Sequence, residues 1–249
     1  MAGRIAYYGN IVRDGLILDL DAAKRDSYPG SGTTWRDIAG LQNNFTLING
    51  PTFVDSSYGA IMLDGIDDFI SGSDVPFRFG NTFSLSCWMY WDGLDKTNVS
   101  FLSKRNGPSG NYNQYAFTIN NGDPYAGGTG KVVGFFARED GNTSTAFDTL
   151  LTYTFPTAGI YNIISVMNTT SQQLYVNGTL ISSSAINYTG KTFNISGRDL
   201  LVGAARDNSG TGILGAFNNK IYNVQIYNRS LNSAEVTQNY NALKGRYGL

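Results

Sequence analysis

The sequence predicts an all-β fold, a two-sheet antiparallel β-sandwich that ends in one short helix. Short segments with period-two alternation recur along the chain and are separated by Gly and Asn, the spacing typical of a sandwich. Residues 232–245 alone have a helical pattern of apolar positions. The 249 residues contain no charge run and no Pro-rich linker, so we expect one large domain.

The clearest local pattern is a three-stranded meander in residues 160–183. Apolar and polar residues alternate up to Met167, a polar run follows, and a second strand ends at Val176. The next two residues, Asn177 and Gly178, suit a two-residue type I′ turn because both tolerate positive φ. The turn is expected to return the chain into a third strand.

The remaining strands are short and are bounded by turn-forming residues. The first, residues 15–22, places three leucines on one face. The others are expected at residues 44–49, 60–63, 83–91, 100–104, 114–120, 132–138, 149–155, 200–205 and 221–227. The strand at 83–91 alternates most strongly: Trp91 shares the core face, and Trp88 and Tyr90 lie on the other face.

The C-terminal helix has recognisable ends. Asn232 is the expected N-cap, and Glu235 at the third helical position completes a capping box. Leu231, before the cap, can pack on Val236. Gly245 is expected to end the helix.

The composition excludes several classes of function. The net charge is −1 and the 18 basic residues are scattered singly, so nucleic acid is not an expected partner. The chain has no His and one cysteine, Cys87, which excludes Ser-His and Cys-His catalysis, zinc sites and an intrachain disulfide. No apolar run reaches the roughly 18 residues of a membrane span, and we expect no signal peptide.

Several phrases of the sequence resemble a known family. They are, in order, GLILDLDAAKRDSYPGSGTTWRD, DGIDDFI, FSLSCWMYW, LYVNG and NKIYNVQIYNRSLNSAEVTQNY. From about Val12 to Leu249 this order resembles the laminin-G-like domains of the concanavalin A-like lectin superfamily. One departure is Ile160, where relatives usually carry Trp. The resemblance implies a jelly-roll sandwich over residues 15–249, preceded by an arm of residues 1–14.

The resemblance also implies a function and a location. Laminin-G-like modules of this type occur in bacteriophage virion proteins, so we expect a non-enzymatic surface structural or decoration protein that binds glycans or a host surface. The expected partners are other virion proteins, a second copy of the chain and a cell-surface glycan, and the expected location is the virion surface. One alternative is a secreted or cell-surface bacterial adhesin, and a more remote one is a glycoside hydrolase.

The acidic residues argue against hydrolysis. Retaining glycosidases need two carboxylates about 5 to 5.5 Å apart, which related enzymes place on alternate residues of one strand. The chain has only two glutamates, Glu139 and Glu235, and they are far apart in the sequence. Because Glu235 already has a capping role, the sequence predicts no enzyme.

An acidic turn at residues 64–68 leaves two interpretations open. Aspartates at a turn commonly bind the backbone of their own loop. Hard cations also take carboxylates from loops, so Asp67 and Asp68 could join Asp207 and Asn208 in a calcium site at one rim of the sandwich. No cofactor is required by the predicted function, and calcium is the one candidate.

A sugar site requires aromatic faces beside polar side chains. The candidates in or beside loops rich in Asn and Gly are Trp35, Trp91, Tyr112 and Tyr125. Each could instead pack beneath a long loop. Trp88 and Tyr90 could line a sheet surface, and the sequence does not choose between these sites.

The N-terminal arm contains a small apolar and aromatic group. Ile5, Tyr7 and Tyr8 precede the region of family resemblance. A partner subunit could bury them, which predicts a role in anchoring the chain to a particle or an oligomer. Alternatively, the segment could be an edge strand of the domain's own sandwich.

Overall fold

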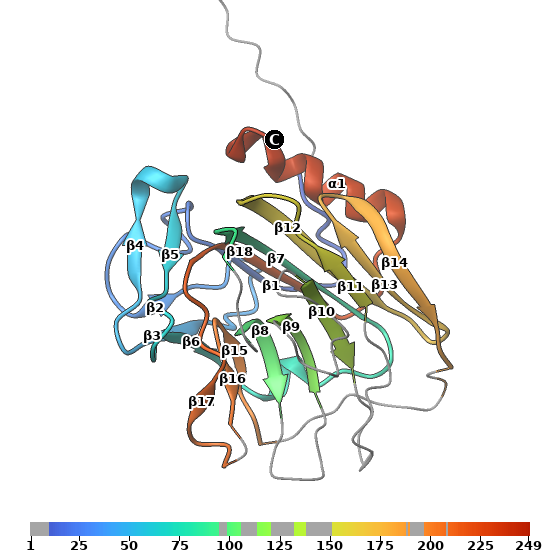
Figure 1. Cartoon of the computed structure of the whole chain (residues 1–249), viewed down its shortest axis with the longest axis horizontal. Helices are drawn as coiled ribbons and strands as arrows, with labels where there is room; N and C mark the ends of the chain where they lie inside the picture. The colour runs from blue at the N-terminus through green and yellow to red at the C-terminus, as the bar shows by residue number, and fades with distance from the viewer. Residues whose placement is uncertain are drawn as a thin grey trace, which may run out of the picture.

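The sandwich is confirmed by the computed structural model, which describes residues 10–94, 99–105, 114–120, 132–137, 151–187, 189, 197–207 and 209–249. Two large antiparallel sheets pack face to face, and α1 (Ser233–Lys244) lies on the outer face of one of them (Figure 1). We call that sheet the helix-side sheet and the other the far sheet. No helix in the described ranges is long and apolar enough to span a bilayer.

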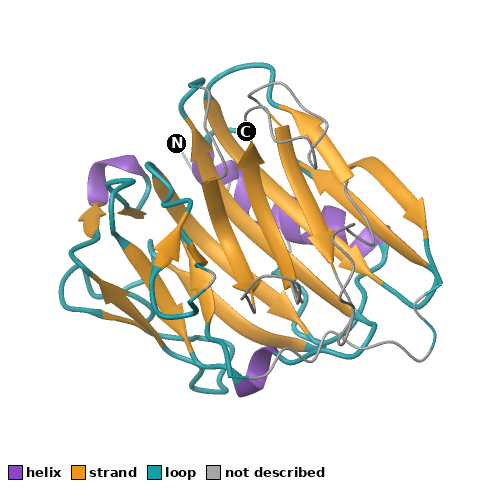
Figure 2. Cartoon of the chain, turned by 60° about the horizontal axis from the view of Figure 1, so that its bottom comes forward, coloured by secondary structure: helices purple, strands orange, loops and turns teal. Residues whose placement is uncertain are grey.

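The helix-side sheet has eight strands. In spatial order they are β14 (Thr179–Ala185), β13 (Ser171–Val176), β12 (Gly159–Met167), β7 (Phe83–Trp91), β18 (Lys220–Tyr227), β5 (Ala60–Met62) and β4 (Thr52–Val54), with β1 (Leu16–Asp21) also paired to β18. Segments from both ends of the chain therefore meet at the middle of this sheet. Figure 2 shows strands of the sandwich crossing the molecule with α1 behind them.

The far sheet also has eight strands. In spatial order they are β11 (Leu151–Thr154), β10 (Val132–Ala137), β9 (Gln114–Asn120), β8 (Val99–Arg105), β15 (Leu200–Val202), β6 (Phe69–Gly72), β3 (Phe45–Ile48) and β2 (Thr34–Trp35). A small hairpin pairs β16 (Ala205–Arg206) with β17 (Ile213–Leu214). Three short 3₁₀ helices complete the described elements: η1 (Asp55–Ser57), η2 (Val75–Phe77) and η3 (Gly245–Tyr247).

The alternation expected in residues 83–91 decides how the layers pack. Phe83 and Trp91, with the odd-numbered residues between them, belong to the core between the two sheets. Trp88 lies on the opposite face, in a second apolar cluster with residues of α1 such as Val236 and Leu243. Both faces of β7 are therefore buried, because α1 covers the outer one.

The meander and the helix cap follow their local signals. Asn177 and Gly178 have φ values of 50° and 76°, as a type I′ turn requires. The Asn232 side chain accepts a hydrogen bond from the Glu235 amide, and the Glu235 carboxylate accepts one from the Asn232 amide. Both predictions are confirmed.

The C-terminal end of the helix requires a correction. Gly245 keeps a right-handed helical φ of −63°, and the chain continues into η3 before Gly248 turns left-handed with a φ of 72°. The extra turn carries Tyr247 to within 4.7 Å of the Trp88 ring and 5.1 Å of the Tyr222 ring, measured between centroids. Burial of Tyr247 against the sheet thus favours a longer helical ending than Gly245 suggested.

Residues 11 and 12, which the sequence analysis assigned to the arm, pack on the domain itself. Ile11 and Val12 are buried in the cluster beneath α1. The Val12 amide donates to Asn239 Oδ1 at 2.8 Å, and the Tyr227 hydroxyl donates to the Val12 carbonyl at 3.0 Å. Ile5, Tyr7 and Tyr8 lie outside the described residues, so their anchoring role stays a prediction.

These contacts predict different stabilities for two truncated chains. A chain that begins at Asp14 should be less stable to unfolding by about 3 kcal/mol than one that begins at Asn10, because it loses two buried apolar side chains and two buried hydrogen bonds. Urea denaturation of both chains measures the difference. Equal stabilities would contradict the packing of residues 11 and 12 on α1.

Candidate functional site

The structure corrects two of the four predicted sugar-stacking residues. Trp35 is fully buried and Trp91 is 1% exposed, and both belong to the core between the sheets. The Trp91 ring stacks on Phe155 with 5.3 Å between centroids. Alternation along β7 puts Trp91 on the inward face, so its nearness to a loop does not expose it. Tyr112 and Tyr125 lie outside the described residues and stay predictions.

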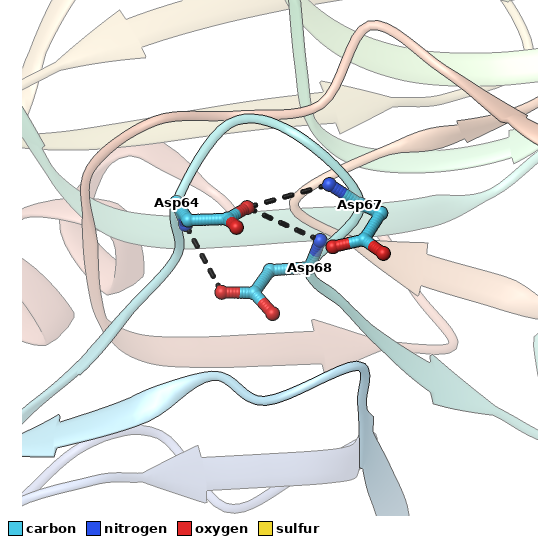
Figure 3. A group of neighbouring side chains, drawn as sticks. All are labelled: Asp64, Asp67 and Asp68. Carbon is cyan, nitrogen blue, oxygen red and sulfur yellow. Dashed lines mark hydrogen bonds between the residues drawn. The ribbon is translucent and has the colours of Figure 1, made fainter.

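The acidic turn between β5 and β6 is closed by its own hydrogen bonds (Figure 3). Asp64 Oδ1 accepts from the amides of Ile66, Asp67 and Asp68 at 2.8, 3.3 and 3.4 Å. In return, the Asp64 amide donates to Asp68 Oδ2 at 3.1 Å. This is the Asx-turn chemistry that the sequence left open, and it explains the spacing of the aspartates without an ion.

The turn shifts two of its carboxyl groups in opposite directions. Hydrogen bonds from backbone amides, first that of Ile66, lower the pKa of Asp64 because they stabilise the carboxylate. Burial raises the pKa of Asp68, and the nearby charges of Asp64 and Asp67 add to that shift. Asp64 therefore ionises more readily than an ordinary aspartate, and Asp68 ionises less readily.

As a cation site, the turn is smaller than predicted. One carboxylate oxygen each from Asp64, Asp67 and Asp68 lie within 4.8 Å of one another, close enough to share an ion. Asp207 is not in that group: its carboxylate accepts from Ser209 Oγ at 2.6 Å and from the Gly210 amide at 2.8 Å. Asn208 lies outside the described residues. The four-residue site of the sequence analysis is therefore not assembled as expected.

A group of side chains, of which the sequence singled out only Tyr90, meets on the helix-side sheet. Tyr58 follows η1 in the β4–β5 hairpin, Tyr90 lies near the end of β7, and Lys220 and Tyr222 begin β18. Tyr58 is exposed and Tyr90 and Lys220 are half-buried, whereas Tyr222 is 1% exposed. We call these four residues the tyrosine surface. In Figure 1 the β4–β5 hairpin and the chain after α1 lie toward the same side of the sandwich.

The rings of this group are held by contacts between distant segments. Tyr58 is 51% exposed, and its ring meets that of Tyr247 edge-on with 5.9 Å between centroids. The Lys220 ammonium lies over the Tyr90 ring, 5.2 Å from its centroid. Burial raises the pKa of Tyr222 to about 12, and the nearby hydroxyls of Tyr90 and Tyr58 add to the shift.

Two backbone irregularities shape the surface. Tyr58 has a φ of 65°, a left-handed conformation that is unfavourable for a bulky residue. The pairing of β18 with β7 shifts register between Ile221 and Asn223, and the intervening Tyr222 belongs to the cluster beneath α1 rather than to the core. Such bulges redirect side chains. The only sequence signal for this group was the outward position of Tyr90 in residues 83–91.

The carboxylate of Glu235, the only glutamate in the described residues, is occupied by hydrogen bonds at the start of α1. Beyond its capping bonds, its carboxylate oxygens accept from Arg229 Nη2 at 2.7 Å and Nη1 at 2.9 Å. The Arg229 hydrogen bonds lower the pKa of Glu235. Glu139 lies outside the described residues.

The sequence matches a known family over most of its length. The profile of a family described as the concanavalin A-like lectin/glucanases superfamily matches residues 64–237, which is more than half of the chain. The comparison with curated proteins gives no match.

Solved structures with a similar fold include binding domains of toxins and of a carbohydrate-active enzyme. The ligand-binding domain of botulinum neurotoxin serotype D, in complex with N-acetylneuraminic acid, aligns with a TM-score of 0.66 and 14% identity, over 92% of this chain and 51% of that one. The binding domain of Paraclostridial Mosquitocidal Protein 1 gives 0.61 and 15%, over 92% and 52%. This chain thus spans about half of those toxin domains.

Domain 4 of AbnA, an extracellular arabinanase from Geobacillus stearothermophilus, aligns over nearly its whole length. Its structure, in complex with arabinotriose, gives a TM-score of 0.63 and 15% identity, over 90% of this chain and 98% of that domain. At these identities the likeness establishes the fold that the chain shares with both groups.

Proposed function

The chain belongs to the concanavalin A-like lectin/glucanases superfamily, and from this premise we propose that it is a non-enzymatic carbohydrate-binding domain. The observation that carries the proposal is the end-to-end likeness to domain 4 of AbnA, whose structure is a complex with arabinotriose. The likeness spans one whole sandwich in each protein. The toxin domain solved with N-acetylneuraminic acid adds weaker support, because this chain matches only about half of it.

The described carboxylates favour binding over hydrolysis. Asp64 and Asp68 are close together and their pKa values shift in opposite directions, as in an acid and base pair. However, Asp64 Oδ1 and Asp68 Oδ2 accept hydrogen bonds from the amides that close their own turn. We assign these aspartates to the structure of the turn.

A glycan array tests the carbohydrate-binding proposal. The purified chain should bind a subset of immobilised neutral and acidic oligosaccharides, arabinotriose and 3′-sialyllactose among them, and free oligosaccharide should compete for that binding. Aromatic stacking and a few hydrogen bonds give single-sugar sites modest affinity, so the array should be read at protein concentrations up to about 100 μM. An array without any bound glycan would contradict the proposal.

Calcium binding by the acidic turn is a second proposal. Three carboxylates supply part of the six to eight oxygens that calcium takes. Because a ligand that binds only the native state raises the melting temperature, 5 mM calcium should raise it relative to chelator, and Asp67→Asn should abolish the rise. Asp207→Asn is the matched control and should keep it. The same melting temperature in calcium and in chelator would remove the site.

The virion setting remains a proposal based on sequence resemblance. In that setting the domain would decorate a particle surface, and Ile5, Tyr7 and Tyr8 would dock on another virion protein or on a second copy of the chain. The carbohydrate-binding proposal holds equally for a secreted or cell-surface adhesin.

A further inference from the structure

We propose that the tyrosine surface is the sugar-binding site of this domain and that it selects sugars carrying a carboxylate. The inference rests on the proposed function, because it assigns a place and a ligand class to carbohydrate binding. Its four residues, Tyr58, Tyr90, Lys220 and Tyr222, come from three elements far apart in the sequence. Tyr222 is buried, so the other three are the residues that a sugar would contact. The fold alone brings them together.

Tyr58 offers an exposed aromatic ring. Sugars stack their apolar faces on aromatic rings, so a sugar site needs a ring that is held firmly and still open to solvent. Tyr58 meets both conditions: it is 51% exposed, and its ring is braced edge-on by Tyr247. Trp35 and Trp91 are braced as well, but they are closed off in the core.

The backbone of Tyr58 is held by its surroundings. A left-handed φ is unfavourable on a bulky residue and persists only where neighbouring structure imposes it. The next residue, Gly59, lies so close to Ala23 that a Cβ on it would come within 2.5 Å of the Ala23 Cα. The hairpin is thus packed against the segment after β1, and Tyr247 contacts the Tyr58 ring itself.

The hydroxyls of Tyr58 and Tyr90 are available for hydrogen bonds to a sugar. The hydroxyls of Tyr58 and Tyr90 make no hydrogen bond to any described residue. Each can therefore donate to or accept from a sugar hydroxyl. An aromatic face combined with free hydroxyls at its edge is the combination that orients a sugar ring.

The positive charge of Lys220 determines the class of sugar. Among the residues that the structure describes, none places a carboxylate within 4.0 Å of the Lys220 ammonium. Arg246, which lies over the Tyr247 ring, is by contrast paired, with its Nη1 2.7 Å from Asp21 Oδ1. Lys220 is thus a half-buried positive charge held over Tyr90 with no carboxylate partner among the described residues, and the carboxylate of a sialic or uronic acid would supply one.

The experiment compares acidic oligosaccharides with their carboxyl-reduced forms. An array carrying sialylated and uronic-acid oligosaccharides in both forms is probed with the wild-type chain. Titration calorimetry then measures the affinity for the strongest acidic member. Wild type should prefer the acidic form by at least about tenfold, the value of one charged hydrogen bond. Lys220→Gln should remove the preference, and Tyr58→Ala should weaken both forms by about tenfold.

Lys244→Gln is the matched control. The Lys244 ammonium also lies over a tyrosine ring, that of Tyr240, at 5.4 Å, but outside the tyrosine surface. Its substitution should leave both affinities unchanged, and circular dichroism should show all three variants folded. If glycans bind the Lys220 and Tyr58 variants as tightly as wild type, the inference is wrong although the domain binds sugar. If wild type binds no glycan, both the inference and the proposed function are wrong.

Discussion

Substitution of Trp88 by alanine should lower the free energy of unfolding by about 4 kcal/mol, the usual cost of removing a buried tryptophan side chain. Trp88 is 1% exposed and stacks on Tyr240 with 5.6 Å between centroids and 6° between ring planes. The Tyr247 ring also packs on Trp88, with 4.7 Å between centroids. The Trp88 ring thus contacts both α1 and the turn that follows it.

Urea denaturation followed by tryptophan-independent circular dichroism measures the effect. Trp88→Phe is the matched control, because it keeps an aromatic ring between the sheet and α1 and should recover more than half of the loss. A change below about 1 kcal/mol in Trp88→Ala would show that α1 docks without this residue.

Removal of Trp88 should also affect the tyrosine surface. Tyr247 supports Tyr58 on one side and Tyr222 on another, and Tyr247 itself packs on Trp88. A helix that detaches would therefore leave the Tyr58 ring unsupported. Sugar affinity in Trp88→Ala should fall even at temperatures where the sandwich stays folded.

Local rules made most of the fold predictable. Alternation identified the inward face of β7, the Asn177 and Gly178 pair identified the type of the turn between β13 and β14, and the capping box located the start of α1. Each of these signals lies within a few neighbouring residues. The late end of the helix was not predictable, because it depends on Tyr247 reaching Trp88 across the layer.

The candidate site was less predictable because it depends on long-range pairing. Trp91 looked accessible from its neighbouring loop, yet its position in the β7 alternation buries it. Tyr58 had no signal at all, since its importance comes from a left-handed backbone and from contact with the C-terminal turn. Asp207 failed to join the acidic turn because its own loop occupies its carboxylate.

A buried ion pair at the edge of the core gives the second large prediction. Lys104 on β8 is completely buried, and its ammonium lies 2.6 Å from Asp74 Oδ1 and 2.7 Å from the Asp74 carbonyl. Arg78 and the Gly197 amide also bind the Asp74 carboxylate. Burial opposes ionisation of Asp74, but these hydrogen bonds outweigh it and hold its pKa well below the usual range.

The direction of that shift fixes the pH dependence. The folded-state pKa of Asp74 lies below the unfolded value of about 3.9, so ionised Asp74 stabilises the fold above about pH 4. The contribution is lost as the pH falls below that value toward the folded pKa. The free energy of unfolding of the wild type should therefore fall more steeply between pH 5 and pH 2 than that of Asp74→Asn, which lacks this titrating group.

Asp74→Asn should lower the free energy of unfolding at pH 7 by about 3 kcal/mol, because it leaves the Lys104 ammonium buried without its counter-charge. The value is at the lower end for buried pairs because the Asp74 side chain is 19% exposed.

A double variant that adds Lys104→Met to Asp74→Asn removes the buried ammonium as well, so it should be more stable than Asp74→Asn alone. Urea denaturation at pH 7 measures all three chains, with the exposed Asp55→Asn as control. If the double variant were the least stable chain, neutralising the buried ammonium would not be the main role of Asp74. Its carboxylate would then stabilise the fold mainly through Arg78 and the Gly197 amide.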